Sequence, residues 1–254
     1  MLIDTHSHIY STDFIQDLDE VVQRAYSNDV RKIVLPNIDS SSVKNLLNLV
    51  DTYPHICIPL MGLHPTSVTQ DYKEELQLVE YWLKKRKFYG IGEIGIDLYW
   101  TKTFLEEQTD AFRFQLSLAQ QYKLPVVIHV RDSFDEVYAV LKDINDENLT
   151  GVFHSFTGTI EQANLVIDMG FKIGVGGIIT FKKSGVDQVI KQIDPSHLIL
   201  ETDAPYLTPT PFRGKRNESS YLVYVAQKIA DLHQVTVGEI ATITTENARK
   251  LFAI

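Results

Sequence analysis

The sequence predicts an α/β protein, a (β/α)8 TIM barrel formed as a single domain by residues 1–254. Three observations support this fold. The length of 254 residues is that of one such barrel, and 44% hydrophobic residues suffice for a large core. Short apolar runs also alternate with amphipathic stretches, as in repeated βα units. An open, doubly wound sheet is the alternative, but eight strands with alternating helices close more readily into a barrel.

Each predicted strand is a short apolar or β-branched run, and each predicted helix has apolar residues at helical spacing. The predicted strands, in order, are Leu2–Thr5, Lys32–Pro36, Ile56–Gly62, Tyr89–Ile94, Pro125–Val130, Gly151–His154, Lys172–Gly176 and Leu198–Glu201. One helix follows each of the first seven strands and two follow the eighth: Leu18–Asn28, Ser41–Thr52, Glu74–Lys87, Leu105–Tyr122, Phe134–Ile144, Ile160–Met169, Gly185–Ile193, Ser219–Leu232 and Thr236–Phe252.

The acidic net charge excludes a protein that coats nucleic acid nonspecifically. At a formal charge of -9, the chain lacks the broad basic face that such binding needs. Phosphate binding must therefore be local, and the two basic clusters are Arg213-Gly214-Lys215-Arg216 and Lys182-Lys183. The alternative is that each cluster is a solvated surface loop.

The sequence gives no sign of membrane insertion or secretion. It has no run of eighteen apolar residues, and its first residues lack a basic start followed by an apolar stretch. We therefore expect a cytoplasmic protein. The single cysteine, Cys57, lies in an apolar run and is expected to be a buried thiol. No interface pattern stands out, so we expect a monomer.

Histidines and carboxylates gather where predicted strands end. In a (β/α)8 barrel the chemistry lies at the C-terminal ends of the strands. Five of the eight histidines follow or end predicted strands: His6, His8, His64, His129 and His154. The carboxylates of Glu93, Glu201 and Asp203 fall at the same end.

Six of these residues form a candidate metal-ligand set. His6 and His8 lie two residues apart, so their imidazoles share a face and can converge on one ion; the alternative is a pair of solvated or core histidines. The set is His6, His8, Glu93, His129, His154 and Asp203. Nitrogen and oxygen donors without a thiolate suit Zn²⁺, Mn²⁺, Co²⁺ or Mg²⁺.

The number of ligands predicts two ions. A catalytic zinc ion takes about three protein ligands plus water. Glu93 lies on the fourth predicted strand, midway between the first strand and the strands of His129 and His154, so it can reach both ions. Asp203, on the strand next to the first, would complete one site with His6 and His8.

The motifs together resemble those of the TatD-like deoxyribonucleases of the amidohydrolase superfamily. Six match in order over nearly the whole chain: Asp4-Thr5-His6-Ser7-His8, Gly62-Leu63-His64-Pro65, Gly92-Glu93-Ile94-Gly95-Ile96-Asp97, Ile128-His129-Val130-Arg131, His154-Ser155-Phe156-Thr157-Gly158 and Glu201-Thr202-Asp203-Ala204-Pro205-Tyr206. The resemblance implies the barrel, a divalent-metal centre with the six ligands above, and hydrolysis of DNA phosphodiesters, often from a 3′ end. Together with the ligand count, we expect two divalent ions (Mg²⁺, Mn²⁺ or Zn²⁺) and a 3′-5′ exonuclease that acts on single-stranded DNA ends.

One departure from the family concerns the basic loop. The family often continues Arg-Gly-Lys-x-Asn-Glu-Pro, whereas here Glu218 is followed by Ser219. Proline at the first helical position is favourable but dispensable, so the difference affects how the next helix begins. The resemblance also favours contact between this loop, through Arg213 and Lys215, and substrate phosphate.

Four further roles are predicted around the metals. Asp203 would bind an ion and accept a proton from the attacking water. Glu201, on the same strand face, would orient a histidine ligand or relay the proton. His64 would donate to a phosphate oxygen or the leaving group, or else make a supporting hydrogen bond.

Arg131, two residues after His129, offers a fork of donors to a phosphate oxygen, or else an ion pair to Asp132 or Asp97. Glycines of the seventh strand, Gly174, Gly176 and Gly177, would let substrate approach the backbone. The aromatic residues expected near the mouth either stack on bases or simply pack. They are Tyr99, Trp100, Phe156 and Tyr206.

Other activities fit the same ligand set. A metal-activated water attacks any suitably placed electrophile, so an aminoacyl-tRNA deacylase, a lactonase or a phosphotriesterase-like enzyme is the alternative. Phosphotriesterase-like barrels bridge their metals with a carbamylated lysine on strand four, where this chain has Glu93, which favours a nuclease. A noncatalytic metal- or nucleic-acid-binding protein is a third possibility, and the full ligand set speaks against it.

Overall fold

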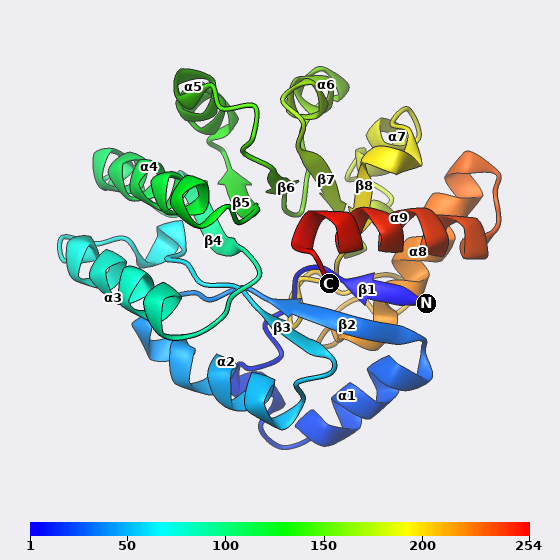
Figure 1. Ribbon diagram of the computed structural model, residues 1–254. Helices are drawn as coiled ribbons and strands as arrows, with labels where there is room; N and C mark the ends of the chain where they lie inside the picture. The colour runs from blue at the N-terminus through cyan, green and yellow to red at the C-terminus, as the bar shows by residue number, and fades with distance from the viewer.

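Eight parallel strands form the inner wall of the structure, a computed structural model that describes residues 1–254 (Figure 1). The strands are β1 (Leu2–Asp4), β2 (Val30–Leu35), β3 (Cys57–Pro59), β4 (Ile91–Asp97), β5 (Val126–Arg131), β6 (Gly151–Phe153), β7 (Lys172–Val175) and β8 (Leu198–Leu200). The predicted α/β barrel architecture is confirmed.

The wall consists of two hydrogen-bonded segments, one of β1 to β3 and one of β4 to β8. Single bridges join them, between Met61 and Ile91 on one side and between Ser7 and Ala204 on the other. At the second junction the Thr5 N–H donates to the Leu200 carbonyl at 2.9 Å. The segment that follows β1 is thereby held directly against the end of β8.

Nine α-helices surround the wall (Figure 1). They are α1 (Leu18–Ser27), α2 (Ser40–Thr52), α3 (Tyr72–Lys85), α4 (Leu105–Tyr122), α5 (Phe134–Ile144), α6 (Ile160–Asp168), α7 (Val186–Ile190), α8 (Leu222–His233) and α9 (Val237–Phe252). None of them is both long and apolar enough to cross a membrane. Capping boxes fix the first turns of α2, α6 and α9, with Asp39, Thr159 and Thr236 as the capping residues.

The core has two parts. The larger lies between the strands and the helices. The smaller fills the barrel interior, where side chains such as Ile3, Val127 and Ile199 pack together with Phe252 from α9. Because α9 also packs on β1 and β8, it covers the N-terminal end of the barrel, which leaves the other end for the site.

Several boundaries differ from the predicted ones, most instructively in β4, which begins at Ile91 and continues to Asp97 instead of ending at Ile94. A glycine inside a strand usually weakens it and often marks the close approach of another backbone. In the structure a Cβ at Gly95 would lie 2.1 Å from the His129 carbonyl oxygen, and φ there is +142°. Gly95 therefore lets β4 and β5 approach each other, and the strand carries Asp97 to the mouth.

Two helices also differ from the prediction. α7 is shorter than predicted, because the chain turns after Ile190 and reaches Pro195. The stretch predicted as one helix from Ser219 begins as a short 3-10 helix, Ser219–Tyr221, before α8.

Candidate metal centre

The loops after β1 and β8 bring the first group of predicted ligands together. The Asp203 N–H donates to the His6 carbonyl at 2.9 Å, and the His8 N–H donates to the Ala204 carbonyl at 2.7 Å. These bonds hold the two loops side by side. Asp203 has φ of +56°, a conformation that costs energy for a residue other than glycine and is common at functional sites.

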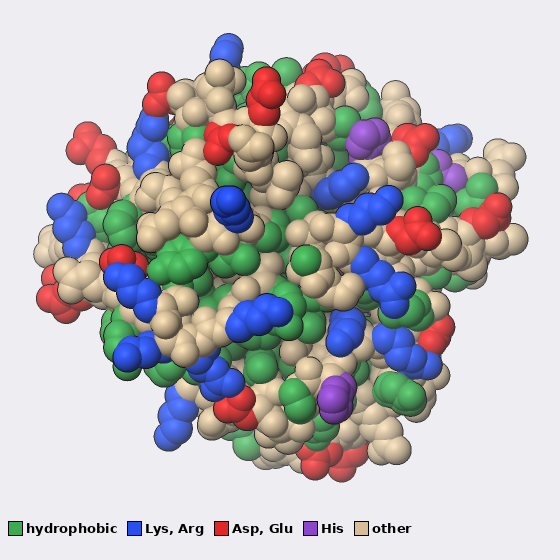
Figure 2. All heavy atoms as spheres, viewed as in Figure 1, with side chains coloured by type: hydrophobic (Ala, Val, Ile, Leu, Met, Phe, Trp, Pro, Cys, Tyr) green, Lys and Arg blue, Asp and Glu red, His purple; other side chains and the backbone are tan.

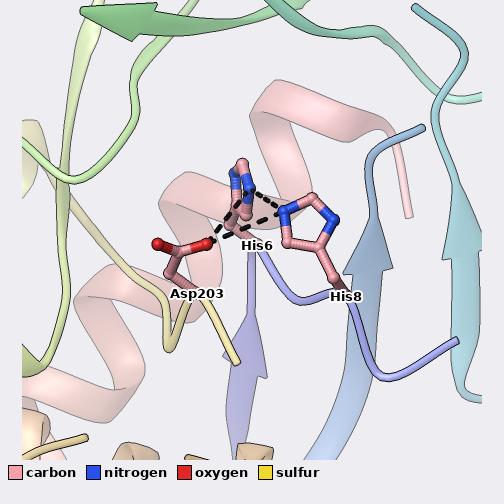
Figure 3. Close-up of side chains that lie close together, drawn as sticks. All are labelled: His6, His8 and Asp203. Atoms are coloured by element: carbon pink, nitrogen blue, oxygen red, sulfur yellow. Dashed lines mark hydrogen bonds and ion pairs between the residues drawn. The ribbon is translucent and has the colours of Figure 1, made fainter. Parts of the chain in front are cut away.

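Figure 3 shows the side chains of His6, His8 and Asp203 pointing toward one another. The two Nε2 atoms of the histidines lie 3.0 Å apart. Asp203 Oδ1 lies 3.8 Å from His6 Nε2 and 3.7 Å from His8 Nε2. Three donors from two loops thus surround one point, as expected for the predicted first ion.

Glu93, on β4, lies between this group and a second one. Its Oε2 is 3.0 Å from His6 Nε2, and its Oε1 is 2.8 Å from His129 Nδ1 and 3.3 Å from His64 Nε2. The carboxylate is only 3% exposed. Each oxygen therefore faces a different set of imidazoles, which is the arrangement expected of a bridging ligand.

His154 lies closer to the first group than predicted. Its ring stacks on that of His6 with centroids 3.5 Å apart, and its Nε2 is 3.8 Å both from Glu93 Oε1 and from Asp203 Oδ2. The clusters able to hold an ion join His154 with His6 and Glu93, and His129 with His64 and Glu93. The pairing of His129 with His154 at one ion stays a prediction.

Two ligand histidines are oriented by partners behind them. His8 Nδ1 lies 2.8 Å from the Tyr10 hydroxyl, which itself donates to the Pro36 carbonyl. The His8 Nδ1–H therefore donates to Tyr10, and the Nε2 lone pair faces the centre. In the same way His129 Nε2 lies 2.8 Å from Asp97 Oδ2, so Nδ1 faces Glu93.

His64 is oriented the opposite way. Its Nδ1 accepts a hydrogen bond from the Thr66 N–H at 3.1 Å, capping a short 3-10 helix, Pro65–Ser67. The neutral imidazole must then carry its proton on Nε2, the atom that faces Glu93 and His129. His64 is thus positioned as a hydrogen-bond donor, although distance alone would allow it to be a ligand.

Charges in the centre are strongly coupled. Burial alone would raise the pKa of Glu93, but the surrounding histidines hold it well below its usual range. Burial alone would lower the pKa of His154, but Glu201, Glu93 and Asp203 raise it to about 10. Burial raises the pKa of Asp203 to about 6, despite His154 and His8. Buried histidines and carboxylates with shifted pKa values are typical of a site where histidines lose their protons when cations bind.

Glu201 lies behind His154. It is 1% exposed, and its Oε1 lies 3.0 Å from His154 Nδ1 and accepts a hydrogen bond from the Ser155 N–H at 2.5 Å. Its other oxygen, Oε2, is buried with no partner. Of the two predicted roles, orienting a histidine ligand fits this ion-pair distance, although the contact lacks the geometry of a directed hydrogen bond.

The prediction that glycines of the seventh strand admit substrate is wrong for two of them. A Cβ at Gly174 would lie 2.5 Å from Glu201 Oε2, and one at Gly177 would lie 2.0 Å from the Leu207 carbonyl oxygen. These glycines make room for neighbouring protein groups. Gly174 in particular provides the space in which Glu201 reaches His154.

Two supporting residues were not recognised from the sequence. From the sequence, the role predicted for Asp97 is only that of an alternative partner of Arg131. Tyr10 was not considered. The signal for Tyr10 in the sequence is its spacing. Tyr10 follows His8 by two residues, as His8 follows His6, so it continues the same alternation of side chains.

Arg131 lies at the mouth, over the Tyr99 ring at 3.7 Å. It makes no ion pair with Asp97 or Asp132, so that alternative is wrong. Its exposed side chain lines a cleft of about 660 Å³ that also includes His154. The guanidinium is therefore free to meet a substrate beside the metal centre.

The basic loop after β8 is exposed. The Arg213 guanidinium lies over the Phe181 ring at 3.5 Å, and Lys215 Nζ lies 5.6 Å from the Phe212 ring centroid. Neither side chain has a carboxylate partner, whereas Arg216 pairs with Asp17. Arg213 and Lys215 thus remain available to an anion.

The aromatic residues near the mouth divide into two kinds. Phe156 is only 7% exposed and packs in the core, whereas Tyr99, Trp100 and Tyr206 are 54%, 69% and 57% exposed. Only the exposed three can stack on a substrate base.

Comparisons with known proteins identify the family and relatives that are metal-dependent hydrolases. The family model described as TatD related DNase matches residues 3–253. An uncharacterized metal-dependent hydrolase of Bacillus subtilis is 40% identical over 255 residues, covering 100% of both chains. The crystal structure of a TatD homologue from Escherichia coli K12 has a TM-score of 0.93 at 32% identity, covering 100% of this chain and 98% of that one. A TatD family hydrolase from Entamoeba histolytica, at 24% identity and a TM-score of 0.85, covers 99% of this chain and 97% of its own and shows the fold alone.

Proposed function

The chain belongs to the TatD-related DNase family and is a metal-dependent hydrolase, and from this premise we propose that it shortens single-stranded DNA from the 3′ end with two divalent cations. One observation carries the proposal. The two oxygens of Glu93 face separate groups of imidazoles, His6 with His8 on one side and His129 on the other. A centre bridged in this way is suited to displacement at phosphorus.

The donor set fits divalent cations. The groups around Glu93 offer imidazole nitrogens and carboxylate oxygens without a thiolate, which suits Mg²⁺, Mn²⁺ or Zn²⁺. Residues His6, His8 and Asp203 would hold one ion, with His129 and His154 at the other. Two bound cations would offset charge on the scissile phosphate and lower the pKa of the attacking water.

Asp203 is placed to accept the proton of the attacking water. Its carboxylate is 15% exposed, more than any other carboxylate of the centre, so water can reach it. Burial raises its pKa to about 6, which leaves it ionised but basic at neutral pH. Glu201 would act through His154 by keeping the Nδ1 proton and thus the direction of Nε2.

His64 would donate a hydrogen bond from Nε2 as the ester bond breaks. The hydrogen bond from Thr66 to Nδ1 directs the Nε2 proton inward, and burial lowers the pKa of the imidazole, although Glu93 opposes this shift. The neutral ring would then donate a hydrogen bond to a phosphate oxygen or to the leaving oxygen.

The cleft and the basic loop would hold the strand. Arg131 can bind a phosphate oxygen through its fork of donors, and the exposed Tyr99 and Trp100 beside it can stack on a base. Arg213 and Lys215 supply positive charge in the basic loop after β8. Local positive charge of this kind compensates for the overall charge of -9.

The test is degradation of single-stranded DNA labelled at the 3′ or the 5′ end. Chelator-treated protein would be given Mg²⁺, Mn²⁺ or Zn²⁺ separately, beside His129→Ala and Asp203→Ala. We expect metal-dependent shortening from the 3′ end that both variants lose. Intact DNA under every metal would contradict the proposed nuclease activity. Hydrolysis of a carboxylic, aminoacyl or phosphotriester substrate by the same preparation would show that the centre acts on another type of ester.

A further inference from the structure

A second hollow lies at the end of the barrel opposite the metal centre. It measures about 790 Å³, within the range of small-molecule sites. The segments that precede β4, β5 and β6 line it, and the end of α9 closes one side. Since the ligands follow the C-terminal ends of the strands, this hollow shares no residue with the site described above.

Positive charge dominates the lining. Three lysines from three separate segments, Lys87, Lys123 and Lys250, face one acidic residue, Asp146. No lysine of the three is within ion-pair distance of a carboxylate, and Asp146 accepts hydrogen bonds from Gln120 and Asn148. Figure 2 shows Lys and Arg side chains across the middle of this face, with most Asp and Glu near its rim. In a chain with a net charge of -9, such unpaired basic groups indicate an anionic ligand.

Most of the remaining lining is apolar or aromatic. Tyr89 is half-buried beneath Lys87, whose Nζ lies 4.4 Å from the ring centroid. Phe88, Pro125 and Phe252 lie at the base of the hollow and are buried. Ammonium groups beside an aromatic ring suit a ligand that has both a phosphate and a flat heterocycle.

We propose that this hollow binds a free nucleoside monophosphate, with its phosphate between the three lysines and its base against Tyr89. The volume suits one nucleotide, and the lining supplies both the charge and the flat apolar surface. The site does not depend on the nuclease proposal, because it needs neither the metals nor any ligand residue.

Helix ends offer a competing explanation for two of the lysines. Lys123 directly follows α4, and Lys250 lies in the last turn of α9, where positive charge stabilises a helix. This explanation does not cover Lys87, which follows α3 by two residues and has its Nζ over Tyr89. It predicts a loss of stability on substitution without a change in nucleotide binding.

The test is calorimetric titration of the metal-loaded full chain with adenosine 5′-monophosphate. The test variant carries Lys87→Gln, Lys123→Gln and Lys250→Gln. The control carries Lys44→Gln, Lys73→Gln and Lys191→Gln, three exposed lysines outside the hollow. His129→Ala is titrated as well, so that binding at the metal centre is separated from binding in the hollow.

We expect the control and His129→Ala to bind the nucleotide in the hollow like the wild type, and the test variant to bind it at least about tenfold more weakly, a difference of about 1.4 kcal/mol. Adenosine should bind weakly to all. DNA shortening by the test variant should equal that of the wild type. Equal binding by the test and control variants would overturn the proposal, as would binding lost only in His129→Ala. Stronger binding of a short oligonucleotide than of the mononucleotide in the hollow would also overturn it, in favour of a nucleic-acid surface.

Discussion

His129 lies between two carboxylates, with Nε2 2.8 Å from Asp97 Oδ2 and Nδ1 2.8 Å from Glu93 Oε1. The ring cannot turn without losing one of these contacts. Asp97 thereby selects which nitrogen faces the centre, which makes it a positioning residue for a metal ligand.

Asp97→Asn should weaken the centre without unfolding the protein. The amide keeps a hydrogen-bond acceptor but removes the charge that orients His129, so we expect metal affinity to fall by about 10- to 100-fold. A metal titration followed by activity at saturating metal separates binding from catalysis. Asp143→Asn, on the exposed surface, is the control; equal affinities of the two variants would contradict the role of Asp97.

His64→Ala should remove activity but no metal. Because Nδ1 accepts from Thr66, His64 faces the centre as a donor, and the loss of such a hydrogen-bond donor lowers kcat by about 10²-fold or more. Elemental analysis of the dialysed variant should find the same number of ions as in the wild type. The loss of one ion per chain would instead make His64 a ligand.

Arg213→Gln with Lys215→Gln should weaken DNA binding in a salt-dependent way. Each lost phosphate contact on a single strand lowers the slope of log K against log salt by about 0.7, so two contacts lower it by about 1.4. Fluorescence anisotropy with labelled single-stranded DNA over a salt series measures this slope. Lys44→Gln with Lys73→Gln removes the same charge elsewhere, and an equal effect of both pairs would show that only net charge matters.

Metal affinity should rise with pH from neutral to about pH 10. In the metal-free centre, the carboxylates of Glu201, Glu93 and Asp203 raise the pKa of His154 to about 10 against the effect of burial. The imidazole is therefore protonated below that pH and must lose its proton to bind a cation.

Glu201→Gln tests this coupling, because it removes a carboxylate that raises the pKa of His154. The variant should release fewer protons on metal binding at neutral pH. Calorimetry in two buffers of different ionisation enthalpy counts these protons. Equal proton release by the variant and the wild type would contradict the coupling of Glu201 to His154.

The sequence predicts the barrel and the residues of the candidate site because both depend on the local pattern of apolar and polar residues. Apolar runs mark the strands, and the strand ends mark the mouth, so His6, His129 and Asp203 could be placed together without coordinates. The burial of Cys57, at 2% exposure, follows from the same pattern.

Other features depend on how strands approach each other, which residue spacing does not encode. The sequence predicts a strand that ends at Ile94, but the strand continues through Gly95, whose close contact with β5 brings Asp97 to His129. The missing side chain at Gly174 predicts an opening for substrate, but Glu201 fills that space. The direction of the His64 ring depends on a hydrogen bond from Thr66, and spacing alone cannot distinguish a ligand from a donor.

The most direct test of the account is a crystal structure of the Mn²⁺-loaded protein with anomalous diffraction from the metal. We predict two peaks about 3.5–4 Å apart, one on each side of the Glu93 carboxylate, with His64 coordinating neither. A single peak, or two peaks without Glu93 between them, would contradict the bridged centre on which the proposed function rests.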